Sequence, residues 1–215
     1  MIKRIVFFDL DGTILDGMSS EKSFFFYLLK KGHIGIKQFF GYWLFILKWF
    51  PKYKLRAFVK NKSYLAGSSK DKITTLAEQF VTEKLLKKIR PELIKKIEEH
   101  RRTGDIIILL TGTPSFIAQV FAKHLNIDHV EPTHCVLEDE NFSHLSPTQH
   151  PYAEEKLTIA KRVCQQYGID IKNCFAYGNS IHDSILLSAV GQAIAVTPDK
   201  KLRKIAKENH WEIIE

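Results

Sequence analysis

Apolar runs that end abruptly in polar residues recur along this 215-residue chain. Residues 5–8 have the sequence Ile-Val-Phe-Phe, and Asp9, Asp11, Gly12 and Thr13 follow within the next five positions. An unbroken β-branched and aromatic run is typical of a strand that is buried on both faces of a parallel sheet. The two-residue spacing places both aspartates on one side of the backbone, at the edge where open α/β sheets bind ligands. We therefore predict a functional site here.

A second boundary of this kind lies near the middle of the chain. Residues 106–110 are apolar, and Thr111 and Gly112 follow them. Pro114 then predicts the first turn of a helix, because proline is favoured at that position. We therefore expect a second buried strand that ends beside the first.

The last third of the chain continues the alternation of strands and helices. Lys156 lies near the start of an amphipathic helix, and residues 174–178 lead into a polar turn with Asn179 and Asp183. Residues 193–214 predict a strand, a helix and a strand. Strands that alternate with helices are typical of the α/β class with a parallel sheet.

The closeness of Asp9 and Asp11 has a chemical consequence. Two carboxylates repel each other unless a cation lies between them. The pair therefore predicts either a Mg²⁺ site or an acid and base pair with separated pKa values, and both roles can coexist.

These four motifs, in this order, resemble those of the haloacid dehalogenase superfamily of phosphatases, in particular its phosphoserine-phosphatase-like branch, subfamily IB. The resemblance covers nearly the whole chain. It implies a three-layer, Rossmann-like α/β domain with a mostly parallel sheet and an inserted helical cap. The corresponding boundaries place the catalytic core at residues 1–16 and 86–215 and the cap at residues 17–85.

The resemblance also implies a role for particular residues and Mg²⁺ as the cofactor. The catalytic residues would be Asp9, Asp11, Thr111 and Lys156; Thr13, Gly112 and Asn179 would bind phosphate or substrate; Asp9, Asp11, Asn179 and Asp183 would hold the metal. The family usually has aspartate where this chain has Asn179. Asparagine keeps one oxygen acceptor but lacks the negative charge, so we expect weaker metal binding unless Asp183 compensates.

The chemistry that this site would perform follows from the charge of its substrate. A phosphate monoester is doubly negative, so hydrolysis needs positive charge and an aligned nucleophile. Asp9 would attack phosphorus to form an aspartyl-phosphate, and Asp11 would protonate the leaving oxygen and later deprotonate the attacking water. A halide leaving group needs no proton, so Asp11 argues against dehalogenase chemistry. We expect a Mg²⁺-dependent phosphomonoester hydrolase.

The chain's net charge of +8 is concentrated in one segment. Between Lys22 and Lys70 there is no aspartate or glutamate, and lysines alternate with many aromatic residues. We predict helices at 20–31, 35–49, 52–65 and 70–82, separated at Gly32, Pro51 and residues 67–69.

Two interpretations of this segment remain open. The aromatic residues could fill a helical bundle with solvated lysines outside. Alternatively, residues 39–50 could lie in the interface of an anionic membrane, since they are too short for the roughly 20 apolar residues that a span needs. The second interpretation gives a loose resemblance to phosphatidylglycerophosphate phosphatases and a lipid phosphate as substrate.

Other substrates and partners follow from other features. Phosphoserine is less favoured, because Met18 stands where phosphoserine phosphatases have a glutamate, and Glu21 could replace it only if the turn differs. Phosphoserine or another small phosphorylated metabolite is one alternative. A catalytically weak protein that binds a phosphorylated ligand is another, and a nucleic-acid-binding module is the least favoured.

The number and spacing of the cysteines indicate the redox state of the protein's cellular compartment. Cys135, Cys164 and Cys174 are odd in number and have no metal-type spacing, which fits a reducing cytoplasm. The apolar run before Asp9 lacks the pattern of a signal peptide. We expect a cytoplasmic protein, with contact to the inner face of a membrane if the second interpretation holds. The oligomeric state and natural substrate stay open.

Overall fold

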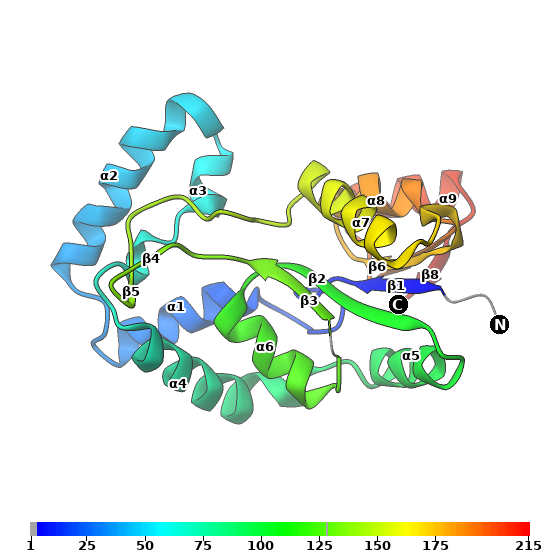
Figure 1. The fold of residues 1–215 in the computed structure, drawn as a ribbon, viewed down its shortest axis with the longest axis horizontal. Coiled ribbons are helices and arrows are strands. Elements are labelled where there is room, and N and C mark those ends of the chain that lie inside the picture. The colour runs from blue at the N-terminus through cyan, green and yellow to red at the C-terminus, as the bar shows by residue number, and fades with distance from the viewer. Residues whose placement is uncertain (1–3, 128) are drawn as a thin grey trace.

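The computed structural model describes residues 4–127 and 129–215, and within them six strands form one parallel sheet (Figure 1). Along the sheet the order is β3-β2-β1-β6-β7-β8, and every neighbouring pair is parallel. The strands are β1 (Ile5–Phe8), β2 (Ile106–Pro114), β3 (His129–Thr133), β6 (Phe175–Gly178), β7 (Gln192–Val196) and β8 (Glu212–Ile214). A separate antiparallel hairpin joins β4 (Leu137–Glu138) to β5 (Asn141–Phe142).

The central strand β1 is buried on both faces, as its apolar run predicts. Val6 and Phe8 belong to one apolar cluster of the molecule, and Ile5 and Phe7 belong to another. Successive side chains of a strand point to opposite faces, so the unbroken run supplies both cores at once. β1 therefore anchors the centre of the sheet.

Helices cover the two faces of the sheet and complete a three-layer α/β fold (Figure 1). On one face lie α5 (Pro91–Arg102) and α6 (Ser115–His124), and on the other lie α7 (Glu154–Tyr167), α8 (Ser184–Ala189) and α9 (Lys200–Glu208). Short turns of 3₁₀ or π helix lie at Ser63–Leu65, Val81–Leu85, Leu86–Lys88, Ile171–Asn173 and Ile181–Asp183. The predicted fold class is confirmed, including the strand, helix and strand at the end of the chain.

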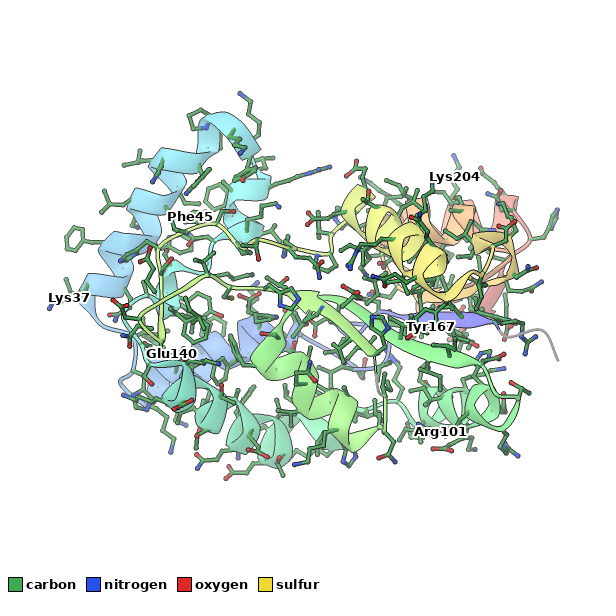
Figure 2. All side chains as sticks on the ribbon, viewed as in Figure 1. Lys37, Phe45, Arg101, Glu140, Tyr167 and Lys204 are labelled. Atoms are coloured by element: carbon green, nitrogen blue, oxygen red, sulfur yellow. The ribbon has the colours of Figure 1, made fainter. Side chains whose placement is uncertain are left out.

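Four further helices come from the basic, aromatic segment: α1 (Ser20–Lys30), α2 (Ile36–Tyr53), α3 (Arg56–Lys60) and α4 (Lys70–Phe80). Phe24 of α1 and Ile73 of α4 are buried in the same apolar cluster as Phe116 of α6. By contrast, Phe45 of α2 lies in a small separate cluster between α2 and α3 (Figure 2). In Figure 1, α2 and α3 stand apart from the sheet.

The division into a core and a cap at residues 17–85 stays a prediction, and residues 1–3 of the predicted core lie outside the described residues. The two apolar clusters do not divide the chain at these boundaries, since α1 and α4 pack against α6. Within the described residues, no helix is both long enough and apolar enough to cross a membrane.

The predicted helix break at Pro51 is wrong. α2 continues through Pro51 to Tyr53, and the predicted helix at 52–65 is reduced to the five residues of α3 and a short turn. Proline in a last turn removes a single backbone hydrogen bond, and its fixed φ angle is helical. The position of a proline alone therefore misplaced the end of the helix.

The second boundary also differs from the prediction. β2 continues through Thr111 and Gly112 to Pro114, with a register shift against β3 after Leu110. α6 begins one residue later, at Ser115. Pro114 has extended backbone angles and therefore precedes the helix. Thr111 is thus carried on strand backbone, which holds its hydroxyl in a defined direction.

Candidate active site

The carboxyl ends of the three central strands meet at one edge of the sheet. β1 pairs with both β2 and β6, so the residues that follow these strands are neighbours. A pocket of about 240 Å³ opens at this edge. Its walls include these residues of the predicted set: Asp9, Asp11, Thr111, Gly112, Lys156 and Asn179. Thr13 and Asp183 are buried behind the wall and contact it through hydrogen bonds.

Lys156 is the buried cation of this pocket. Its Nζ atom lies 2.7 Å from Asp9 Oδ1 and 2.6 Å from Asp183 Oδ1. Burial alone would lower the pKa of Lys156, but the two carboxylates outweigh it and raise the pKa above its ordinary value. Lys156 therefore stays charged, and it reaches the sheet edge from the first turn of α7.

Asp9 is less completely neutralised than its short contact with Lys156 implies. Burial raises the pKa of Asp9 to about 7, because Lys156 offsets only part of the loss of hydration and the negative charge of Asp183 adds to the rise. The backbone NH of Asp9 donates to the carbonyl of Tyr177, 3.1 Å away, which ties Asp9 to β6. The site thus holds a fixed carboxylate that a further cation would stabilise.

The chemistry of the donor set fits a hard divalent cation such as Mg²⁺. Thr13 Oγ1 lies 3.5 Å from Asp9 Oδ2 and 3.4 Å from Asn179 Oδ1, so these two possible metal-ligand oxygens lie on either side of the same hydroxyl. Carboxylate and amide oxygens are the ligands that Mg²⁺ accepts in proteins. The carboxylates of Asp9 and Asp183 share the single positive charge of Lys156, which leaves negative charge for a cation to balance.

Asp11 is held in a different direction from Asp9. Its Oδ1 accepts a hydrogen bond of 2.8 Å from the backbone NH of Ser20, and its Oδ2 accepts one of 3.0 Å from Thr113 Oγ1. Ser20 begins α1 and Thr113 belongs to β2. Two elements far apart in the sequence therefore fix Asp11 beside Asp9 without an ion pair to any described residue, as a group that transfers protons would require.

Both oxygens of Asp183 already have partners. Oδ1 contacts Lys156, and Oδ2 accepts hydrogen bonds from the backbone NH groups of Asn179 and Ser180 and from Ser180 Oγ. These contacts lower the pKa of Asp183, although burial opposes them. In the part of the chain that the structure describes, no three His, Cys, Asp or Glu side chains form a ready metal cluster. The metal role of Asp183 stays a prediction, while its contacts order the loop.

Several residues that line the pocket were not predicted as site residues from the sequence. Val59, His150 and Tyr152 line it together with the predicted residues. Thr133 Oγ1 donates to the carbonyl of Gly112 at 2.6 Å, so its contact of 2.8 Å with His150 Nδ1 requires that nitrogen to carry the proton. Burial and nearby lysines lower the pKa of His150 to about 2, so its ring is neutral. Nothing local in the sequence signals this placement.

Glu21 also lines the pocket, but its carboxylate is occupied. Its Oε2 lies 2.6 Å from Lys62 Nζ, and its Oε1 accepts a hydrogen bond of 3.0 Å from the Tyr64 hydroxyl. Lys62 and Tyr64 are both buried. The negative charge of Glu21 is therefore balanced inside the protein.

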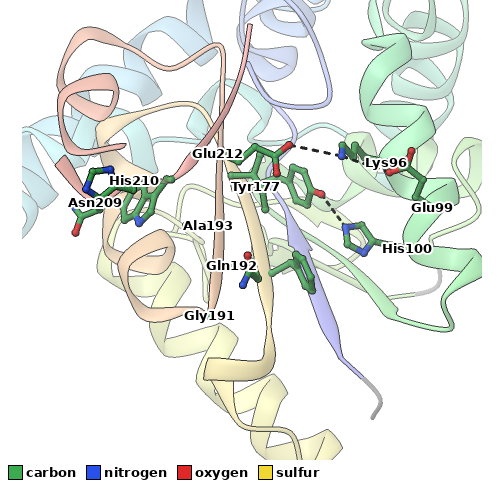
Figure 3. Close-up of a pocket in the computed structure, with 13 residues that line it drawn as sticks. Lys96, Glu99, His100, Tyr177, Gly191, Gln192, Ala193, Asn209, His210 and Glu212 are labelled. Carbon is green, nitrogen blue, oxygen red and sulfur yellow. Dashed lines mark hydrogen bonds and ion pairs between the residues drawn. The ribbon is translucent and has the colours of Figure 1, made fainter. Parts of the chain in front are cut away.

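A second pocket of about 360 Å³ lies beside β6, β7 and β8 (Figure 3). None of the predicted site residues lines it. In it His100 Nε2 lies 2.9 Å from the Tyr177 hydroxyl, and His100 Nδ1 lies 2.8 Å from Asp105. The Tyr177 ring stacks on Phe8 at 4.3 Å. The hydrogen bonds tie Tyr177 of β6 to α5, and the stacking ties it to β1, so this side of the sheet is held together behind Asp9.

A comparison with known sequence families identifies the family of this chain. Residues 6–188 match the model of the haloacid dehalogenase-like hydrolases. The chain belongs to this family. Within the family, the chain is 28% identical over 154 residues to phosphoserine phosphatase SerB1 of Mycobacterium tuberculosis, covering 72% of this chain and 50% of that protein. The chain thus spans about half the length of this relative.

Two other comparisons cover the whole chain. A histidinol-phosphatase of Neisseria meningitidis serogroup C is 26% identical over 227 residues, 99% of each protein. The crystal structure of a protein of unknown function from Bordetella pertussis Tohama I superimposes with a TM-score of 0.84 at 22% identity, over 100% of this chain and 99% of that one. This structural likeness establishes the shared fold.

Proposed function

We propose that this haloacid dehalogenase-like hydrolase is a Mg²⁺-dependent phosphomonoester hydrolase. The observation that carries the proposal is the position of Lys156 between Asp9 and Asp183. It places a fixed positive charge beside an aligned carboxylate, which is what attack on a dianionic phosphate requires. The separately held Asp11 supports the same reaction.

The reaction would proceed in two displacements. Asp9 attacks phosphorus, the bond from phosphorus to the ester oxygen breaks, and Asp11 gives its proton to the departing alcohol. Water then attacks the aspartyl-phosphate on Asp9 while Asp11 takes a proton from the water. The bond from phosphorus to Asp9 breaks and phosphate leaves. Lys156 and the Thr111 hydroxyl would hold the phosphoryl oxygens, with the backbone of Gly112 beside them.

Asp9 and Asn179 would hold Mg²⁺, with Asp11 and Asp183 as the further predicted ligands. The bound metal would supply positive charge that offsets the repulsion between Asp9 and the phosphate. Asn179 contributes an uncharged oxygen, so we expect weaker metal binding than an aspartate would give. This chain's own contribution is to fix Asp9 and Asn179 on adjacent strand ends.

For the substrate, we favour a phosphomonoester with an apolar alcohol, such as an anionic lipid phosphate like phosphatidylglycerophosphate. The internal neutralisation of Glu21 by Lys62 and Tyr64 argues against a free receptor for an ammonium group. The apolar side chain of Val59 forms part of the pocket wall. Such a substrate would be met at the inner face of a cytoplasmic membrane.

A small phosphorylated metabolite with an amine is the second candidate. The observation that favours it is that Glu21 lines the same pocket as Asp9, within reach of a bound molecule. The names of the relatives, a phosphoserine phosphatase and a histidinol-phosphatase, point in the same direction. In this case, Lys62 would have to release Glu21 when the substrate binds.

The test is a panel of phosphate esters with Mg²⁺: p-nitrophenyl phosphate, phosphoserine, histidinol phosphate and a short-chain phosphatidylglycerophosphate. We expect the Asp9→Asn variant to lose turnover of every ester by about 10³-fold or more, because it removes the nucleophile. Asp139→Asn is the matched control, since Asp139 is exposed in the hairpin turn with a φ of 48° that asparagine tolerates.

The preferred ester separates the two substrate candidates. Equal turnover by Asp9→Asn and the intact chain would overturn the proposed nucleophile. If the intact chain hydrolyses no ester with either Mg²⁺ or Mn²⁺, but binds one of the esters, the protein is one that binds a phosphorylated ligand without hydrolysis. Strongly salt-dependent binding to DNA or RNA without turnover would favour the nucleic-acid-binding alternative.

A further inference from the structure

The outward side of α2 carries an apolar stripe in solvent. Its exposed apolar side chains are Ile36, Phe39, Phe40, Trp43, Leu44, Leu47 and Phe50. Their spacing of three and four residues places them on one side of a helix with about 3.6 residues per turn. Leu47 is 74% exposed and Ile36 is 76% exposed. Large apolar surface of this extent on a soluble protein marks a site of interaction.

The opposite side of α2 already has its partners within the chain. Gly41, Phe45 and Ile46 are buried there, and Phe45 and Ile46 pack against Ala57 of α3. Figure 2 shows Phe45 on this inner side. The folded chain therefore buries one side of α2, and the apolar stripe on the other side remains exposed to solvent.

The rim of the stripe is positively charged. The helical spacing places Lys37 and Lys48 along one border of the stripe. The ammonium groups of Lys48 and Lys52 each lie 5.5 Å from the centre of the Trp49 ring. No aspartate or glutamate occurs between residues 22 and 70 to balance these charges locally.

An apolar groove borders the same stripe. It lies between α1 and α2, has a volume of about 520 Å³, and shares Ile36, Phe39 and Trp43 with the stripe. The remaining walls are mostly aromatic and aliphatic, including Phe25 and Leu29. A hydrocarbon chain fits the chemistry of such a groove, whereas a polar polymer does not.

We propose that the outer stripe of α2 docks onto the surface of an anionic lipid bilayer. The apolar side chains would enter the interface between headgroups and hydrocarbon, and the lysines would contact lipid phosphates, as in helices that lie along a membrane surface. A second copy of the chain fits less well, because symmetric pairing would bring two lysine-rich rims together without an acidic partner.

Exposed apolar side chains continue along the chain beyond α2. After α2, Leu55 and Phe58 are exposed, and the next residue, Val59, lines the pocket that holds Asp9. Docking that also engages Leu55 and Phe58 would bring the pocket close to the bilayer and give a lipid phosphate direct access. This last step rests on the proposed function, whereas docking itself does not.

Flotation with lipid vesicles tests the proposal. We expect the full chain to bind vesicles of phosphatidylcholine and phosphatidylglycerol about tenfold or more tightly than vesicles of phosphatidylcholine alone, and to bind less tightly at about 0.5 M salt. Leu47→Glu should weaken binding to the anionic vesicles by about tenfold or more, because it puts a carboxylate in the stripe. Ile94→Glu on α5 is the matched control and should bind normally.

Two further readouts keep the proposal distinct from the proposed function. Turnover of p-nitrophenyl phosphate by Leu47→Glu should equal that of the intact chain, and Asp9→Asn should still bind vesicles. The proposal is overturned if the intact chain does not bind anionic vesicles, or if Leu47→Glu and Ile94→Glu bind them equally. A dimer in solution that Leu47→Glu converts to monomer, without vesicle binding, would assign the stripe to a second copy.

Discussion

The edge of the sheet around Asp9 and the outer side of α2 depart in opposite directions from the usual pattern, in which apolar side chains are buried and charged ones are exposed. At the sheet edge the chain buries charge: the side chains of Lys156 and Asp183 are 7% and 5% exposed. On α2 it exposes hydrocarbon, with Leu47 largely in solvent. Charged side chains are usually exposed, and large exposed apolar patches are rare.

The difference lies in where each region finds its partners. At the sheet edge, Lys156 pairs with two carboxylates from distant parts of the chain, so much of the cost of burying charge is offset within the fold. On α2, no element of the described chain covers the stripe, so only another molecule could remove it from water. Substitutions at the edge should therefore affect folding and turnover together, while substitutions in the stripe should affect neither.

Lys156→Met should have the largest effect. It leaves Asp9 and Asp183 buried without their cation, which should destabilise the fold by about 3–5 kcal/mol. Turnover should be lost as well. Chemical denaturation and the ester assay measure both, with exposed Lys161→Met on the same helix as control. If Lys156→Met unfolds at the same denaturant concentration as Lys161→Met, the edge does not depend on this ion pair for stability.

A pair of phenylalanine variants compares the two regions directly. Phe24 is fully buried between α1 and α6, and Phe24→Ala should destabilise the fold by about 3–5 kcal/mol through a cavity. Phe40 is 62% exposed on α2, and Phe40→Ala should change stability by less than about 0.5 kcal/mol. Thermal and denaturant unfolding measure both values. A large loss from Phe40→Ala would show that the stripe supports the fold.

The pH dependence of stability tests whether the buried charge of Glu131 is stabilised by partners within the fold. Burial favours a raised pKa, but hydrogen bonds from His129, Gln149 and Arg162 outweigh it and lower the pKa of Glu131 from 4.5 to about 2. A lowered pKa in the folded state means that the stabilisation is complete above about pH 4.5 and is lost as the pH falls toward 2. After solvent screening it should amount to about 1–2 kcal/mol.

Glu131→Gln should remove this part of the acid dependence of the unfolding free energy. Denaturant unfolding between about pH 5 and pH 2.5 measures it. Exposed Glu83→Gln is the control and should keep the dependence of the intact chain. An unchanged acid profile in Glu131→Gln would mean that these hydrogen bonds do not stabilise the fold.

The smallest expected effect concerns the metal. Asn179→Asp restores a charged oxygen and should lower the activating concentration of Mg²⁺ by about tenfold. Calorimetric titration with Mg²⁺ measures binding without turnover, and Asn173→Asp before β6 is the control. If both readouts stay unchanged, Asn179 is not a ligand.

Much of the fold could be predicted because its signals are local. The unbroken apolar residues 5–8 identified a strand buried on both faces, and the polar residues after it identified the edge of the sheet. Lys156 stood near a helix start in the sequence and does so in the structure. The end of α2 was misplaced at Pro51, because the helix tolerates proline in its last turn and the sequence pattern does not show this.

The chain's order of residues was sufficient for the position of the central strand and for the chemical types at the strand ends, because burial on a sheet and the spacing along a strand are properties of neighbouring residues. Contacts between distant segments decided the rest. Glu21 contacts Lys62 and Tyr64, Asp183 pairs with Lys156, and the apolar stripe of α2 faces solvent. Each depends on which segments pack together, since pairing of a buried charge requires a partner that only the folded chain brings near.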